Sequence, residues 1–177
     1  MSEKSKFSGL SLYWRTYGRW SSVLRSPYFW RSFVPFFLLF PLWVIPVDGE
    51  YRWTAFSLAV LPSFLSFSLA ALAIILSMPT GQFFQIITEE DESENGNRDP
   101  SFYLQVASSF THFIVVQILA LFLILLTYAY PYIVTSALGF YTFCYAIACG
   151  IAAVSTLMSY ANLRKEAASL EVNDAGE

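Results

Sequence analysis

The sequence predicts an all-α integral membrane protein with four transmembrane helices, arranged as two helical hairpins and preceded by an N-terminal amphipathic interfacial helix. Of the 177 residues, 56% are hydrophobic and only 13% are charged, whereas about a quarter of the residues in soluble domains are charged. Residues 54–78 form an uncharged stretch of 25 residues, and residues 100–163 contain no Asp, Glu, Lys or Arg. A soluble chain of this length could not bury so much apolar surface.

Residues 1–28 are predicted to be a basic cytoplasmic segment, and an amphipathic helix is predicted over residues 7–31. Aromatic and aliphatic side chains recur at helical spacing on one side, and basic side chains lie on the other. This pattern is typical of a helix that lies among lipid headgroups. The residues predicted to meet the membrane surface are Trp14, Arg15, Arg19, Trp20, Arg25 and Arg31. The alternative is a cytosolic tail that packs on the bundle or moves freely.

The first predicted span covers residues 29–47, and three prolines interrupt it. Its 19 residues just cross a hydrocarbon layer of about 30 Å, provided that the Arg31 side chain extends to the headgroups. Pro41 lies in its interior and is expected to kink the helix. A re-entrant segment is the alternative, because the uninterrupted apolar run is short.

The second predicted span, residues 54–78, carries small side chains on one face, at alternating steps of four and three. These are Ala59, Ser63, Ser66, Ala70, Ala73 and Ser77. Lipid gives helices no hydrophobic reason to associate, so close packing of small residues brings them together. We expect this face to be a buried interface, either within the bundle or between copies, and to pair with the fourth span. Leu72 is expected to face lipid.

Pro131 separates the third predicted span, residues 108–130, from the fourth, residues 132–160. The fourth span repeats the small-residue pattern with Gly139, Thr142, Ala146, Cys149 and Ala153. The two cysteines lie about 140° apart on a helix, so we interpret them as packing residues and not as a redox pair. Residues 161–177 are predicted to be a short, loose cytoplasmic tail.

An acidic cytoplasmic loop is predicted over residues 79–107. Asp91, Ser93, Asn95 and Asp99 match part of a calcium-binding loop, but Phe102 occupies the position that should supply a bidentate glutamate. An acidic turn around Asn95 and Gly96 is the alternative. We therefore predict no metal and no cofactor. The charges are segregated along the chain, so the net charge gives no indication of nucleic-acid binding.

Four polar residues are predicted to lie within the membrane: Gln105, Ser109, His112 and Gln117. The first three share a helical face that enters from the cytoplasmic side. Intramembrane ionisable groups are often functional, which favours a gate or proton-sensitive switch at His112. The alternative is a neutral histidine bonded to a neighbouring Ser, Thr or carbonyl. Gln117 is expected to form a hydrogen bond between helices or between subunits.

The distribution of basic residues predicts the orientation of the chain. With four spans, nine Lys and Arg residues lie on the side that holds both termini, and only Arg52 lies on the other. Basic residues accumulate on the cytoplasmic side of membrane proteins. We therefore expect both termini in the cytoplasm, and a bacterial inner membrane is the expected location.

Two segments carry a resemblance: LPSFLSFSLAALAIIL at residues 61–76, and SFYLQVASSFTHFIVVQILAL at residues 101–121. Together they resemble an uncharacterised family of small bacterial multi-pass membrane proteins, which are often found in mobile or defence-rich regions. The resemblance covers the middle third of the chain, including His112 and Gln117. It implies a membrane protein with no assigned reaction.

The sequence shows no paired carboxylates, no Cys-His or Ser-His arrangement at a membrane edge and no phosphate-binding glycine loop. These motifs are the usual marks of a catalytic site, so we predict a non-enzymatic protein. The expected function is that of a self-associating sensor or permeability effector, in bacterial stress or phage defence. The alternative is a membrane anchor that recruits a soluble cytoplasmic partner through the acidic loop and the basic N-terminus. A lipid-modifying enzyme is disfavoured, since no nucleophile and base lie together.

Overall fold

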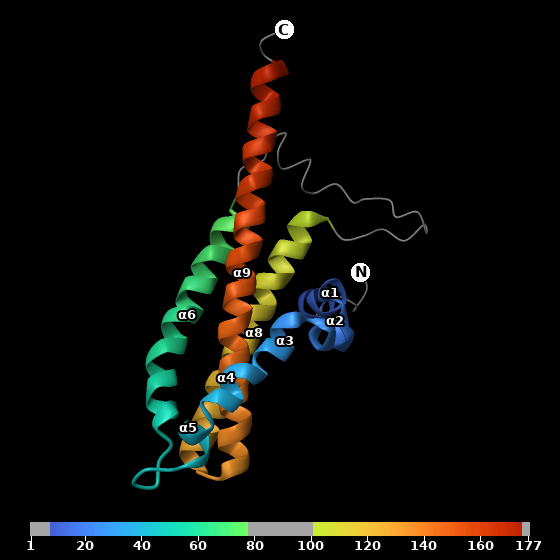
Figure 1. The fold of residues 1–177 in the computed structure, drawn as a ribbon. Helices are drawn as coiled ribbons and strands as arrows, with labels where there is room; N and C mark the ends of the chain where they lie inside the picture. The colour runs from blue at the N-terminus through green and yellow to red at the C-terminus, as the bar shows by residue number, and fades with distance from the viewer. Residues whose placement is uncertain (1–7, 78–100, 175–177) are drawn as a thin grey trace.

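The computed structural model describes residues 8–77 and 101–174, and these ranges are almost entirely helical (Figure 1). The helices are α1 (Ser8–Tyr17), α2 (Arg19–Arg25), α3 (Pro27–Arg31), α4 (Phe33–Leu38), α5 (Phe40–Val44), α6 (Arg52–Leu76), α8 (Phe102–Ala129) and α9 (Ile133–Asp174). Within the described ranges, three helices are long and apolar enough to cross a membrane: α6, α8 and residues 133–159 of α9. The all-α class is confirmed, with three candidate spans where four were predicted.

Helix α8 is the centre of the fold, because it packs against both α6 and α9. After a short turn around Pro131, α9 runs back alongside α8 (Figure 1). The side chains of Val106, Phe110, Ala120 and Ile124 on α8 are fully buried or nearly so. The predicted pairing of residues 54–78 with residues 132–160 is therefore wrong for most of their length. Helix α6 packs on α8, and at its N-terminal end the ring of Trp53 packs against Phe140 of α9.

The packing face of α6 differs from the predicted one. Its buried residues are Trp53, Thr54, Ser57, Leu61, Ser68, Ala71 and Ile75. All six residues of the predicted small-residue face (Ala59, Ser63, Ser66, Ala70, Ala73 and Ser77) are exposed. Within one chain, α6 instead buries larger apolar side chains and the polar Ser68, which bonds across to α8. Leu72, expected to face lipid, packs against the core.

The single helix predicted over residues 7–31 is divided into three. Gly18 has a φ of +95°, a conformation that glycine adopts without steric cost. Ser26 is extended, because Pro27 follows it and disfavours helical backbone at the preceding residue. Helix α1 packs on α8, so the N-terminal segment lies against the bundle, as the alternative interpretation proposed.

The residues predicted to meet the membrane surface lie mostly on the outside of α1–α3. Trp20 is 69% exposed, and Arg25 and Arg31 are also exposed. Trp14 is half-buried, with its ring edge-on to that of Trp20 at 5.2 Å. The Arg15 and Arg19 side chains lie outside the described part of the structure.

The first predicted span is formed by three short helices, α3, α4 and α5, which pack along α9. The expected kink is a complete break at Leu39, two residues before Pro41. Trp43 bridges this break: its Nε1 donates to the Phe36 carbonyl at 2.9 Å and its ring stacks on that of Phe36. Large apolar side chains on the outer side, including Val34 and Leu38, are exposed. An irregular but apolar segment therefore lies beside the three long helices.

A hydrogen-bonded cluster joins α5, α6 and α9 at the end of the bundle near Pro131. Trp53 Nε1 donates to Ser136 Oγ at 3.0 Å, and Ser136 Oγ donates to the Trp43 carbonyl at 2.7 Å. A Cβ at Gly139 would lie 2.7 Å from the Trp53 ring. A larger residue would not fit at position 139, because the Trp53 indole packs directly on the Gly139 backbone.

Helix α9 does not end at residue 160 as expected, but continues to Asp174. The predicted loose tail is helical up to that residue. Its sequence is rich in Ala, Leu and Glu, which favour the helix, and the helix already formed by the span removes the cost of nucleating it.

Candidate functional site

His112 of α8 is held on both sides by tyrosine hydroxyls from other helices. The Tyr13 hydroxyl of α1 lies 2.7 Å from Nδ1, and the Tyr145 hydroxyl of α9 lies 2.9 Å from Nε2. In a neutral imidazole one ring nitrogen donates and the other accepts, so one tyrosine donates to the ring and the other accepts from it. The histidine therefore joins three helices through a single side chain.

Tyr17, one turn after Tyr13 on α1, packs on the same histidine. Its ring stacks on the imidazole with centroids 3.9 Å apart and planes inclined by 13°. Tyr13 and His112 are buried, with 8% and 6% exposed. The α1 helix is thus docked on the bundle by two tyrosines spaced i and i+4, which share one helical face.

Burial raises the pKa of Tyr13 and of Tyr17 to about 12, above the ordinary value of 10. Proximity to each other and to Cys149 acts in the same direction at Tyr13. Both phenols therefore remain protonated at neutral pH, and each can act as a hydrogen-bond donor.

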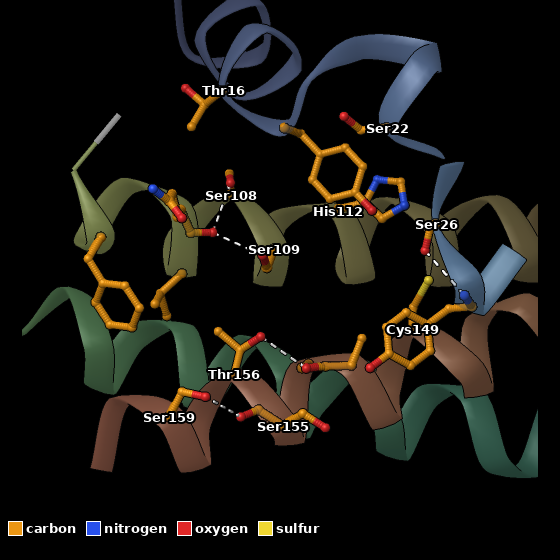
Figure 2. Close-up of a pocket in the computed structure, with 17 residues that line it drawn as sticks. Thr16, Ser22, Ser26, Ser108, Ser109, His112, Cys149, Ser155, Thr156 and Ser159 are labelled. Atoms are coloured by element: carbon orange, nitrogen blue, oxygen red, sulfur yellow. Dashed lines mark hydrogen bonds between the residues drawn. The ribbon is translucent and has the colours of Figure 1, made fainter. Parts of the chain in front are cut away.

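A cavity of about 610 Å³ opens beside His112, between α1–α2, the first turns of α8 and the C-terminal half of the α9 span (Figure 2). Eight Ser and Thr side chains line it: Thr16, Ser22, Ser26, Ser108, Ser109, Ser155, Thr156 and Ser159. Among the described lining residues, none is charged. Its described wall is therefore uncharged and rich in hydroxyl groups, with apolar side chains between them.

The structure brings most of the predicted polar residues together at this cavity. Gln105, Ser109 and His112 all line it, with Cys149 and Ala153 of the predicted α9 face opposite them. The other α9 residues of that face lie nearer the N-terminal end of α9, where Gly139 and Ala146 are buried and Thr142 is partly buried. One end of the small-residue face of α9 thus forms a wall of the cavity.

Gln117 lies elsewhere, fully buried between α8 and α6. Its Nε2 donates to Ser68 Oγ at 3.0 Å, and Ser68 Oγ donates to the Phe64 carbonyl. The Gln117 Oε1 atom has no hydrogen-bond partner among the described residues. Gln117 therefore makes a contact between helices of one chain, which is one of its two expected roles.

The tyrosines were the functional residues that the sequence pattern did not identify. Tyr13 and Tyr145 carry both hydrogen bonds of His112, where a Ser, Thr or carbonyl partner was expected. Tyr17 is one of the aromatic side chains on the apolar side of the predicted interfacial helix. The spacing of Tyr13 and Tyr17 is a signal for a shared face, but it does not say what that face contacts.

Asp91, Ser93, Asn95 and Asp99, which match part of a calcium-binding loop, lie outside the described residues. Within residues 8–77 and 101–174, no group of three His, Cys, Asp or Glu side chains could hold a metal ion. The described site is thus a set of neutral donors and acceptors. It can hold a helix in place and can offer hydrogen bonds to a ligand.

No family model, no curated protein and no solved structure matches this chain. The chemistry of the site is therefore the guide to function.

Proposed function

We propose that this chain is a non-enzymatic, multi-pass protein of the bacterial inner membrane that acts as a sensor, with α1 and α2 as its movable part. The observation that carries the proposal is the attachment of α1 to His112, which is itself bonded to Tyr145 of α9. The attachment lies beside an open polar cavity. A ligand in that cavity is well placed to favour or oppose the docked position of α1.

The size of the response follows from the bonds involved. Release of α1 breaks its hydrogen bond between Tyr13 and His112, and a hydrogen bond contributes about 0.5–1.5 kcal/mol net. Release also breaks the stacking of Tyr17 on His112, and an aromatic pair contributes about 0.5–1.5 kcal/mol. The two contacts together contribute roughly 1–3 kcal/mol. Their loss corresponds to about a 5- to 150-fold shift between docked and released states. A ligand causes such a shift only if it binds one of the two states better.

The topology that we propose has four crossings, with residues 29–47 as the first and both termini in the cytoplasm. The packing of α3–α5 along α9 supports a crossing, as do the exposed apolar side chains on their outer side. The nine-to-one distribution of basic residues supports the orientation. In this arrangement the cavity beside His112 lies at the cytoplasmic end of the bundle.

Self-association through the outer face of α6 would make the sensor a permeability effector. The small residues Ala59, Ser63, Ser66, Ala70 and Ala73 are exposed in the single chain. Small exposed residues at steps of three and four let a second helix approach closely in lipid. A pore along this interface would need several copies, and the resemblance to proteins of defence-rich regions suggests stress or phage defence as the setting.

A second candidate function is that of an anchor for a soluble partner. The observation that favours it is the extension of α9, which continues from residue 160 to Asp174 beyond its apolar part. A helix that extends from the membrane on the same side as the acidic loop offers a surface to a cytoplasmic protein. Replacing Glu89–Glu94 with Ser and Gly should abolish capture of such a partner and leave permeability unchanged.

Leakage of a dye or loss of membrane potential on expression tests the main proposal. We expect His112→Ala to raise leakage at least fivefold over the unsubstituted chain, because α1 loses its attachment. Tyr141→Phe is the matched control, since Tyr141 also donates a hydrogen bond between helices, to the Phe29 carbonyl, away from the cavity. Equal leakage from the unsubstituted chain and both variants would contradict a permeability effector controlled by His112.

A further inference from the structure

We infer that the cavity beside His112 binds a neutral, polyhydroxylated ring, namely a sugar or cyclic polyol, either free or as the headgroup of a glycolipid. This inference rests on the proposed sensor function and names its ligand class. Three properties of the cavity lead to it: its charge, the direction of its hydroxyl groups, and its size and aromatic content.

The lack of charge selects against ions. None of the described residues that line the cavity is acidic or basic. Burying an ion without an opposite charge is costly. Phosphate-containing headgroups and organic cations are therefore poorly matched to the described wall. Neutral polar molecules need no opposite charge there.

The hydroxyl groups of the wall are mainly acceptors. Six of them donate their proton to a backbone carbonyl three or four residues earlier: Ser22, Ser108, Ser109, Ser155, Thr156 and Ser159. A hydroxyl has one proton but two lone pairs, so the lone pairs of these oxygens remain to accept. A ligand with several O–H groups supplies the donors that this wall needs.

The size and the rings of the cavity fit a six-membered polyol. A volume of about 610 Å³ lies in the range of roughly 300–1,000 Å³ that is typical of small-molecule sites. Tyr17, Tyr28 and Phe102 also line it. The C–H face of a sugar ring packs on aromatic rings, and its hydroxyls point outward to polar partners.

The position of the cavity leaves both sources of the ring open. Thr156 and Ser159 lie in the last turn of the apolar part of α9. The cavity therefore opens where α9 leaves its candidate span. A glycolipid headgroup could enter from the bilayer surface, and a free polyol from the aqueous phase.

Binding to the full chain in lipid nanodiscs tests the inference. The free probes are methyl glucoside and myo-inositol, and the lipid probe is monoglucosyl-diacylglycerol incorporated in the disc. We expect at least one of these to bind saturably, while inorganic phosphate and choline do not. Saturation by a free probe identifies an aqueous source, and saturation by the glycolipid alone identifies a headgroup.

The wall variants are Ser155→Ala with Thr156→Val on α9, and Ser109→Ala on α8. Each should weaken binding of the successful probe about tenfold. Thr142→Val is the matched control, because Thr142 on α9 also donates to the carbonyl four residues earlier but does not line the cavity. Thermal unfolding of each variant establishes that it is folded before binding is compared.

No saturable binding of any polyol probe, or binding that both wall variants leave unchanged, would overturn the inference. Tighter binding of phosphate or choline would do the same. Leakage is measured separately from binding, so the proposed permeability function and the proposed ligand class can fail independently. If His112→Ala raises leakage but no polyol binds, only the ligand class is wrong. If a polyol binds but leakage never responds to His112→Ala, the permeability function is wrong and the binding site stands.

Discussion

At the scale of single residues, His112 is the side chain on which both tyrosines of α1 converge. It is the only histidine in the sequence, and its ring nitrogens both meet tyrosine hydroxyls. Histidine suits this position because a neutral imidazole donates from one ring nitrogen and accepts at the other. The stacked ring of Tyr17 covers one of its faces.

The ionisation of Tyr13 and Tyr17 gives a prediction for high pH. Their pKa values of about 12 lie above the ordinary value of 10, so docking favours the protonated phenols. This contribution to stability is fully present below pH 10 and is lost as the pH rises from 10 through 12. Tyrosinate absorbance of the unsubstituted chain, minus that of the Tyr13→Phe/Tyr17→Phe double variant, should titrate with a midpoint near 12. A midpoint near 10 would mean that α1 is not docked.

At the scale of helices, α6 shows why a small-residue pattern is ambiguous. Its regular stripe of Ala and Ser is exposed, while its contacts with α8 use Leu61, Ala71 and Ile75 together with Ser68. On α9 a similar pattern is mainly buried, because α9 packs along α8, and the Trp53 ring of α6 occupies the space at Gly139. The pattern indicates where helices could approach closely, but the bulky partner side chains decide where they do.

The neighbouring residues Ala70 and Ala71 test the assignment of the two faces of α6. Ala71 is buried and Ala70 is exposed. Ala71→Leu should overpack the contact with α8 and destabilise the fold by about 1–3 kcal/mol. Ala70→Leu should change stability by less than about 0.5 kcal/mol but reduce self-association. Thermal unfolding and the oligomeric state in nanodiscs measure the two effects, and the reverse order of stabilities would contradict the assignment.

At the scale of the whole molecule, the sequence predicted the all-α class and the presence of three long helices, but not all of their ends. Helix α8 begins at Phe102, inside the loop predicted over residues 79–107, and α9 continues past residue 160. Long uncharged stretches dictate such helices, since every backbone group must be bonded internally in lipid. The irregular path of residues 27–44 was only partly predictable: prolines signalled an interruption, but not three separate helices. The packing of α1 on the bundle could not be predicted from the sequence, because an amphipathic helix with tyrosines has the same pattern whether it contacts lipid or protein.

The residues of the candidate site could also be predicted only in part. Gln105, Ser109 and His112 stood out because polar residues are rare in an apolar span, and all three line the cavity. Tyr13 and Tyr145 did not stand out, since tyrosine is common near membrane interfaces. The hydroxyl groups on α9 that form the facing wall could not be recognised from the sequence, because the packing of α9 along α8 places them opposite Ser109 and His112.

The docking of α1 on His112 can be tested at Cys149, which is 6% exposed and lines the same cavity as Tyr17 and His112. In a Cys144→Ala background, sealed vesicles of each orientation are treated with a membrane-impermeant maleimide, and the labelling rate of Cys149 is measured. Docking of α1 on His112 predicts slow labelling, only from the face that bears the N-terminus, and a rate at least five times higher after His112→Ala. Labelling from the opposite face, or equal rates with and without His112, would contradict it.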